Sequence, residues 1–367
     1  MRILIAIWAM LISSAALAQT YDSSHGPLKV EKIVGGLEYP WSFAFLPDGA
    51  LLITERPGRL RLFDSQLSPP IANLPPIADL RQGGLLDVVL SPDYSETGRI
   101  YFSYSAYKDG GAQTRVATAV LNRNTPMRLT DGAVIFQQEP VQRSGVHFGS
   151  RIVFADDGSL FITVGDRGQR EEAQNTNAHQ GSIIRVLPSG APHPDNPFIN
   201  GGGRPEIWSY GHRNPQGAVL DDDGDLWTVE HGAMGGDEIN RPQSGGNYGW
   251  PVISYGRHYN GYRIGEGTEK QGMEQPAFYW DPSIAPSGLT QVTGDMFPNW
   301  RGDLLVGALK YRLLSHLTVQ DGKITGEERI LAGAFGRIRD VRMAPDGAIW
   351  FATDSSSGAI YRVTPAH

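Results

Sequence analysis

The residues best suited to chemistry in this sequence are a histidine and an aspartate at the two ends of one predicted hairpin. His147 directly precedes a strand in VHFGSRIVF, and Asp166 follows the return strand of the same hairpin. The two side chains can therefore meet. A carboxylate that fixes the tautomer of a histidine and stabilises its imidazolium makes that histidine a general base. The same spacing also fits a structural hydrogen bond that closes the hairpin, so spacing alone leaves both interpretations open.

Basic residues occupy equivalent ends of predicted strands in separate parts of the chain. They are Arg213, followed by Asn214, in GHRNPQG, Lys310 in GALK, and Arg337 with Arg339 in RIRD. The last two are two residues apart, so in an extended segment both side chains point the same way. Arginine suits bidentate recognition of carboxylates, and lysine provides a compact charge. Each residue alone is more typical of a surface charge, but their shared position favours one common site.

Two glycine-rich segments combine backbone flexibility with acidic residues. EHGAMGGDEIN (230–240) contains Asp237 and Glu238, and GGNYGWP (245–251) follows it. Carbonyl and carboxylate oxygens are typical ligands of calcium, although the spacing is not that of an EF-hand. Gly/Asp segments are also ordinary turns, so this signal is weak by itself.

The elements that must position these residues repeat one pattern: an apolar strand, a Pro/Asp/Gly turn and a second apolar strand. The pattern occurs at 41–56, 85–105, 150–167, 217–232 and 339–354, with a looser copy at 289–309. Asp-Gly between β-rich runs is typical of hairpin turns that need positive φ. Six such hairpins, each followed by further strand-like sequence, predict an all-β, six-bladed β-propeller. A pair of β-sandwich domains is the alternative, but no linker-like change of composition divides the chain.

The repeated pattern also predicts how the propeller ring closes and where its long loops lie. The early strand LKVEKIV (28–34) is expected to pair with C-terminal strands, because an unpaired blade edge promotes aggregation. The connections at 167–205 and 233–285 exceed what blade turns need. We expect these long loops to be functional and to lie on one face of the propeller.

Composition limits the classes of protein and ligand. The 367 residues include 45 Gly and 25 Pro, 40% are hydrophobic and 19% charged, and the net charge is -7. This disfavours helical bundles and disorder, and without a Lys/Arg-rich run it also disfavours nucleic acid as a partner. There is no Cys, so thiol nucleophiles, disulfides and cysteine-ligated metals are excluded. Any metal must bind oxygen or imidazole.

Residues 1–18 have the pattern of a secretory signal peptide. Arg2 precedes the apolar run 3–11, and the segment ends in a small-residue stretch at Ala18. The run is too short for a comfortable membrane span. We therefore expect a single propeller domain over 19–367, exported to the periplasm or secreted, with no membrane span in the mature chain.

Seven motifs, in this order, resemble those of the soluble aldose sugar dehydrogenases and soluble glucose dehydrogenases that use pyrroloquinoline quinone (PQQ): HFGSRIVF, GDRG, GHRNPQG, EHGAMGGDEIN, GGNYGWP, GALK and RIRDV. The resemblance covers about residues 28 to 364 and is strongest to the periplasmic aldose sugar dehydrogenases. It implies a six-bladed propeller, the fold that the repeats predict independently. It also implies oxidation of an aldose sugar at the anomeric carbon to a lactone, with PQQ and Ca²⁺ as cofactors and a further, unidentified electron acceptor.

The resemblance also implies residue roles, motif by motif. His147 corresponds to the catalytic base, and Asp166 to the acidic partner that orients it. The residues that correspond to the cofactor pocket are Gln82, Arg213, Asn214, Trp280, Lys310, Arg337 and Arg339, with Trp280 over the quinone ring. The residues that correspond to metal ligands are Gly232 and Ala233, through their carbonyls, for an active-site calcium, and Glu238 and Tyr248 for a second calcium.

Two other functions stay open at this point. A calcium-dependent lactonase or esterase would need carboxylate and Asn ligands around an axial metal. The basic residues disfavour it, because they would repel the ion unless an anionic cofactor lay between them. A binding propeller that has lost its chemistry is the second alternative, and the intact His-Asp-Arg-Lys set disfavours it. For the dehydrogenase, the cations would offset the three carboxylates of PQQ, and calcium would polarise its quinone carbonyl.

Overall fold

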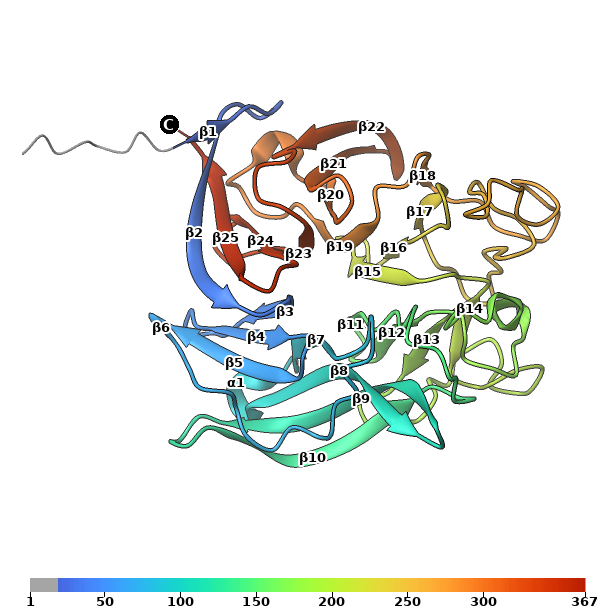
Figure 1. Cartoon of the computed structure of the whole chain (residues 1–367), viewed down its shortest axis with the longest axis horizontal. Helices are drawn as coiled ribbons and strands as arrows, with labels where there is room; N and C mark the ends of the chain where they lie inside the picture. Colours follow the sequence, from blue (N-terminus) through green and yellow to red (C-terminus); the bar gives the residue numbers. More distant parts are fainter. Residues whose placement is uncertain (1–18, 367) are drawn as a thin grey trace, which may run out of the picture.

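Six antiparallel β-sheets form the blades of a propeller around one axis (Figure 1), as the sequence repeats predict. The computed structural model describes residues 19–366, so the predicted signal peptide lies outside the described residues. Contacts link the first strand of each blade to the first strand of the next, from β3 through β7, β11, β15, β19 and β23 back to β3. These strands therefore line the axis.

The first three blades follow the chain in order. Blade 1 contains β3 (Pro40–Phe45), β4 (Leu51–Glu55), β5 (Arg59–Asp64) and β6 (Gln66–Leu67). Blade 2 contains β7 (Leu85–Leu90), β8 (Arg99–Lys108), β9 (Gly111–Asn122) and β10 (Arg128–Gln137). Blade 3 contains β11 (Ile152–Phe154), β12 (Leu160–Val164), β13 (Ser182–Val186) and β14 (Ile207–Tyr210).

The remaining blades complete the ring. Blade 4 contains β15 (Pro215–Leu220), β16 (Leu226–Glu230), β17 (Asp237–Asn240) and β18 (Phe278–Trp280). Blade 5 contains β19 (Pro286–Gln291), β20 (Leu304–Ala308), β21 (Leu313–Gln320) and β22 (Lys323–Ile330). Blade 6 contains β23 (Ile338–Met343), β24 (Ile349–Thr353), β25 (Gly358–Pro365), β2 (Leu28–Leu37) and β1 (Thr20–Tyr21).

The last blade joins the two ends of the chain. Strand β2 pairs antiparallel with β25, with Val30 opposite Val363, which confirms the predicted pairing of 28–34 with C-terminal strands. A buried cluster that includes Phe43, Ile53 and Ile360 then joins blade 6 to blade 1. The hydrophobic core thus lies between neighbouring blades.

The repeated turns have the backbone that the sequence requires. Gly49, Gly158, Gly224 and Gly347 all adopt φ between 81° and 88°, a left-handed conformation that side chains other than Gly rarely take. In blade 2 the turn is replaced by a short helix, α1 (Tyr94–Thr97), which ends at Gly98 with φ 64°. The other helices described are the 3₁₀-helices η1 (Arg170–Gln174) and η2 (Pro298–Trp300). Within 19–366 no helix is long and apolar enough to cross a membrane.

The two predicted long connections are interrupted by blade strands. Strand β13 lies within 167–205, and β17 and β18 lie within 233–285. Strand β17 has the sequence DEIN, which is polar enough to resemble a turn, so its pairing with β16 is invisible to hydrophobic periodicity. The uninterrupted part, 241–277, protrudes at the edge of blade 4 (Figure 1, right).

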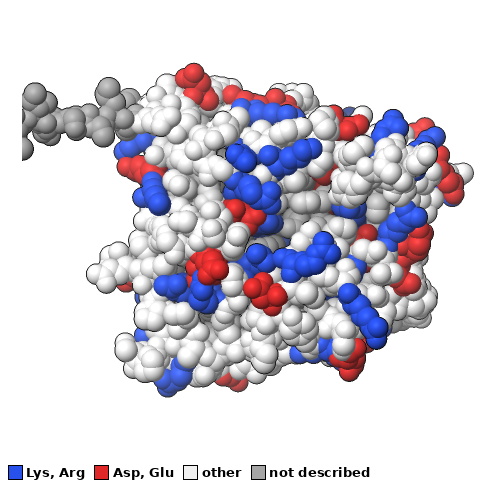
Figure 2. Space-filling model, viewed as in Figure 1, with Lys and Arg blue, Asp and Glu red and all other residues white. Residues whose placement is uncertain are grey.

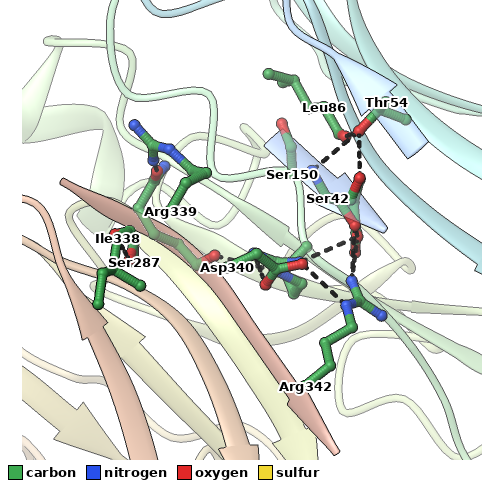
Figure 3. A network of polar contacts seen from close by, with 12 residues as sticks. Ser42, Thr54, Leu86, Ser150, Ser287, Ile338, Arg339, Asp340 and Arg342 are labelled. Atoms are coloured by element: carbon green, nitrogen blue, oxygen red, sulfur yellow. Dashed lines mark hydrogen bonds and ion pairs between the residues drawn. The ribbon is translucent and has the colours of Figure 1, made fainter. Parts of the chain in front are cut away.

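A ring of alternating charges lies in the channel between the innermost strands. Asp87 on β7 contacts Arg151 at 3.0 Å and Arg342 at 2.7 Å, and Asp340 contacts the same arginines at 3.1 and 2.9 Å. Ser42 on β3 donates to Asp87 at 2.6 Å; Figure 3 shows Ser42, Asp340 and Arg342 converging. Burial alone would raise the pKa of Asp87, but the two arginines outweigh it and hold the pKa below its usual value. The ring ties blades 1, 2, 3 and 6 together.

Candidate active site

A cavity of about 580 Å³ lies where the N-terminal ends of the innermost strands meet. Figure 2 shows a hollow at the centre of one face, bordered largely by Lys and Arg side chains. The charged residues that line the cavity are Arg56, Arg81, Arg337, Arg339 and Asp354. A second cavity of about 400 Å³, at the other ends of the innermost strands, is lined by Arg151, Asp340 and Arg342. The charge ring therefore separates the two cavities.

His147 and Asp166 meet beside the first cavity. Nδ1 of His147 lies 2.6 Å from Oδ1 of Asp166, and the side chain of Asp166 is only 1% exposed. Trp250 Nε1 donates to the other carboxylate oxygen at 2.8 Å. Burial alone would raise the pKa of Asp166, but the hydrogen bond from His147 and the nearby charges hold it below the usual value. The carboxylate is therefore ionised, so Nδ1 of His147 carries the proton and Nε2 is left as the basic nitrogen.

The close approach of these two residues depends on glycine. A Cβ added to Gly165 would lie 2.2 Å from the carbonyl oxygen of His147, so only Gly lets the two hairpin ends come together. His147 itself has φ 52°. Its backbone N–H donates to Oε1 of Gln82 at 2.8 Å. Gln82 therefore contacts His147 and also lines the cavity.

Arg56 supports the loop that carries Gln82. Its Nη1 donates to the carbonyl of Arg81 at 2.8 Å, and at 3.4 Å to that of Gly83. Arg56 and Arg81 both line the cavity, although neither belongs to the predicted set. Arg56 ends the first hairpin copy, so its position at a strand end is the signal that could have found it.

Arg337 and Arg339 both reach the cavity and share Asp354. Oδ2 of Asp354 lies 3.0 Å from Arg337 Nε and 3.3 Å from Arg339 Nη2. Although burial opposes it, the two guanidinium charges hold the pKa of Asp354 below its usual value. Arg339 Nη1 also donates to Gln216 at 3.1 Å, while its buried Nε has no partner within 19–366. This Nε can therefore donate a hydrogen bond to a ligand.

Arg213 and Asn214 line different cavities. Asn214 lines the main cavity, whereas Arg213 lines a small adjoining cavity of about 10 Å³ together with Gly232. Nη1 of Arg213 donates to the carbonyls of His231 and Gly232, and its buried Nε is also without a partner in the described chain. Space for a side chain is absent here: a Cβ on Gly232 would lie 2.2 Å from two carbonyl oxygens.

His231, which is not in the predicted set, lies in the wall between these cavities and lines both. Its Nε2 is 2.6 Å from the carbonyl oxygen of Pro286. Burial and the charges of Arg213 and Arg339 lower the pKa of His231 to about 3. The ring is therefore neutral at physiological pH.

Glu238 and Tyr248 also line the small cavity, beside Glu230. Burial and the negative charge of Glu230 raise the pKa of Glu238 to about 8. Asn240 donates to both carboxylates, at 2.9 Å to Glu230 and 3.3 Å to Glu238, while its buried Oδ1 has no partner in the described residues. Crowded oxygens of this kind are what a cation would relieve, although within 19–366 no three His, Asp or Glu side chains form a metal-binding group.

Five residues of the predicted set line neither the main cavity nor the small one. His147 and Asp166 meet beside the main cavity, and the other three lie elsewhere. Trp280 is 2% exposed, packs in the core between blades 4 and 5, and donates to Glu327 at 2.9 Å. Alternation along β18 turns Tyr279 outward and Trp280 inward, and the expectation that Trp280 lies over a quinone stays a prediction. Lys310 is exposed, with its ammonium 5.3 Å from the ring centre of Tyr311. Ala233 packs against a cluster that contains Trp250.

Comparisons with known proteins agree with this architecture. Residues 37–362 match the family model described as glucose/sorbosone dehydrogenase. The aldose sugar dehydrogenase YliI of Escherichia coli is 43% identical over 97% of this chain and 98% of its own. The apo structure of the soluble aldose sugar dehydrogenase of E. coli superposes with a TM-score of 0.89, at 44% identity, over 92% of this chain and all of that one. The PQQ-bound aldose sugar dehydrogenase of Streptomyces coelicolor gives 0.77, at 26% identity, over 92% and 98%.

Proposed function

The chain belongs to the glucose/sorbosone dehydrogenase family, and we propose that it oxidises aldose sugars at the anomeric carbon to lactones, using PQQ and calcium. Relatives in this family are named aldose sugar dehydrogenases, and one has been solved with PQQ bound. The observation that carries the proposal is the arginine-lined cavity beside the His147–Asp166 pair.

The cavity suits PQQ in size and charge. Its volume of about 580 Å³ is within the usual range for small-molecule sites. Four lining arginines and one aspartate leave three positive charges, which match the three carboxylates of PQQ. Arginine binds carboxylates through paired hydrogen bonds, and the unpartnered Nε of Arg339 offers one more donor. When bound, PQQ supplies the acceptor for the two electrons that the sugar loses.

His147 is the proposed base. Asp166 holds the proton on Nδ1, so Nε2 is free to take the proton of the anomeric hydroxyl. Asp166 then stabilises the imidazolium that forms. Gln82 fixes the backbone of His147 through the 2.8 Å hydrogen bond and so keeps the imidazole in place. General-base help of this kind contributes about 10² to 10⁴ in rate.

Calcium is proposed at the small cavity and at the adjacent carbonyls. The crowded carboxylates of Glu230 and Glu238, and the unpartnered Oδ1 of Asn240, provide the oxygen donors that calcium prefers. Tyr248 lines the same cavity, and its hydroxyl donates to the carbonyl of Arg241 and accepts from Gln243 N. The carbonyl of Gly232 accepts a hydrogen bond from Arg213 Nη1, so a calcium ion at this oxygen would displace that guanidinium. Ala233 would contribute only its carbonyl oxygen.

The compartment and partners are part of the proposal. The signal-like segment 1–18 supports export, so we place the mature protein in the periplasm or outside the cell. The sugar substrate and an unidentified electron acceptor complete the reaction. The exposed rim of Arg and Lys around the hollow (Figure 2) leaves the site open to both.

Reconstitution tests the function. Purified protein would be treated with a chelator, then given PQQ, calcium or both, and assayed for sugar-dependent reduction of a dye. We expect turnover only with both, and His147→Gln should lower turnover at least ~10²-fold while PQQ still binds. Turnover in the fully chelated protein would contradict the role of calcium. PQQ binding without turnover would indicate a binding propeller, and lactone hydrolysis without PQQ would indicate a hydrolase.

A further inference from the structure

The imidazole of His231 lines the main cavity, and one of its ring nitrogens has no hydrogen-bond partner within 19–366. Its Nε2 lies 2.6 Å from the carbonyl oxygen of Pro286. A carbonyl cannot donate, so Nε2 must carry the proton. In the neutral ring that carries this proton, Nδ1 keeps a lone pair, and no group within 19–366 donates to it.

Most other side-chain acceptors of known geometry in the cavity wall are already engaged. Oε1 of Gln82 accepts from His147 N, and Oδ1 of Asn214 from Gly149 N and Gln216. Oε1 of Gln216 accepts from Arg339. Asp354 accepts from Arg337 and Arg339 through Oδ2, and its Oδ1 has no partner within 19–366. The lining arginines can only donate. Nδ1 of His231 is therefore the neutral side-chain acceptor that a ligand N–H or O–H can reach, whereas Oδ1 of Asp354 belongs to a carboxylate held beside two arginines.

PQQ has one group that can donate a hydrogen bond to Nδ1. With its three carboxylates ionised, its carboxylate, quinone and pyridine atoms are all acceptors, and the pyrrole N–H is the single donor. We propose that Nδ1 of His231 accepts a hydrogen bond from the pyrrole N–H of PQQ, so that His231 determines which edge of the cofactor faces blade 4. This inference rests on the proposed function. It makes His231 a residue that orients the cofactor in the arginine cavity.

Two variants separate the acceptor from the rest of the side chain. His231→Asn and His231→Phe both lose the contact with Pro286, because Asn is too short and Phe has no donor. Only Asn keeps an acceptor near the position of Nδ1. Any general effect of losing the Pro286 contact is therefore common to both variants.

The test measures binding rather than turnover. PQQ dissociation constants would be determined by absorbance titration of the calcium-loaded wild type and both variants. We expect His231→Phe to bind about tenfold more weakly than His231→Asn, the loss typical of one hydrogen bond. With ¹⁵N-labelled PQQ and labelled wild-type protein, the pyrrole N–H should show a coupling across the hydrogen bond to Nδ1 of His231.

The outcomes distinguish the two proposals. If wild-type protein binds PQQ tightly, but the two variants bind equally and no coupling is seen, the role of His231 is overturned while the proposed cofactor stands. If the wild type does not bind PQQ at all, the proposed function itself fails. Should His231→Phe not fold, the coupling in the wild type still decides the question.

Discussion

Replacing Asp166 by asparagine should impair His147 as a general base without removing the site. The carboxylate accepts from three donors: His147 Nδ1 at 2.6 Å and Gly168 N at 2.7 Å on Oδ1, and Trp250 Nε1 at 2.8 Å on Oδ2. An amide has a single acceptor oxygen. One of the two fixed donors, Gly168 or Trp250, must therefore face the NH₂ group whichever way the amide is turned.

The two amide orientations have different consequences for His147. With the amide oxygen in place of Oδ1, His147 keeps its tautomer but loses the negative charge that stabilises imidazolium. With the oxygen in place of Oδ2, the NH₂ faces Nδ1, and the proton of His147 moves to Nε2, the nitrogen that should act as the base. Either way turnover should fall by about 10² to 10⁴. The donor left unpaired should lower the free energy of unfolding by about 1 to 3 kcal/mol.

The assay compares Asp166→Asn with Trp250→Phe, which removes one donor to the same carboxylate but leaves its charge. Turnover at saturating sugar, PQQ and calcium would be measured with PQQ affinity and urea unfolding. Because the pKa of Asp166 is lowered, its charge stabilises the fold above the unfolded pKa of about 4, and the effect is lost as pH falls through the folded value. The stability gap to Asp166→Asn should therefore close in acid. Turnover within about threefold of wild type, with PQQ bound, would refute the reasoning.

Three further predictions follow from the fold and the cavity. Trp280→Phe removes the hydrogen bond to Glu327 and should lower the free energy of unfolding in urea by about 1 kcal/mol. The PQQ dissociation constant should stay within about threefold of wild type, and a large loss of affinity would indicate that Trp280 contacts the cofactor. Asp87→Asn removes a negative charge that Arg151 and Arg342 share, and it should lower the free energy of unfolding by about 3 to 5 kcal/mol at pH 7. Because the pKa of Asp87 is lowered, this difference should shrink as pH falls below about 4, and a constant difference would argue against the ring. Arg339→Gln should weaken PQQ binding at least tenfold by absorbance titration, and more than Arg337→Gln, since Arg337 is 47% exposed and Arg339 11%; equal effects would contradict this ranking.

Much of the fold was predictable because each blade repeats a local signal. The turn glycines, such as Gly49 and Gly347, are needed for a left-handed backbone, and that need is visible in the sequence as Asp-Gly. Strand β17 was not predictable from periodicity, because its DEIN sequence places acidic residues in a strand. Its pairing is set by neighbouring strands and not by its own composition.

The site was predictable where one hairpin supplies both partners. His147 and Asp166 stand at the two ends of one hairpin, so local sequence determines their meeting. Arg56, Arg81 and His231 come from different blades, and their convergence depends on how the blades are arranged around the axis. Trp280 is a different case: the sequence does not show which side of β18 it takes, because packing between blades 4 and 5 decides this.

The pairing of β2 with β25 has a consequence for how the molecule is made. The ring can be completed only after synthesis has passed residue 365, because the middle of blade 6 is built from both ends of the chain. Until then the growing polypeptide exposes unpaired edges on β2 and β24, which favour self-association. Loss of even the final eight-residue strand would leave the same two edges bare, so a stalled or trimmed product should be a target for chaperones and proteases.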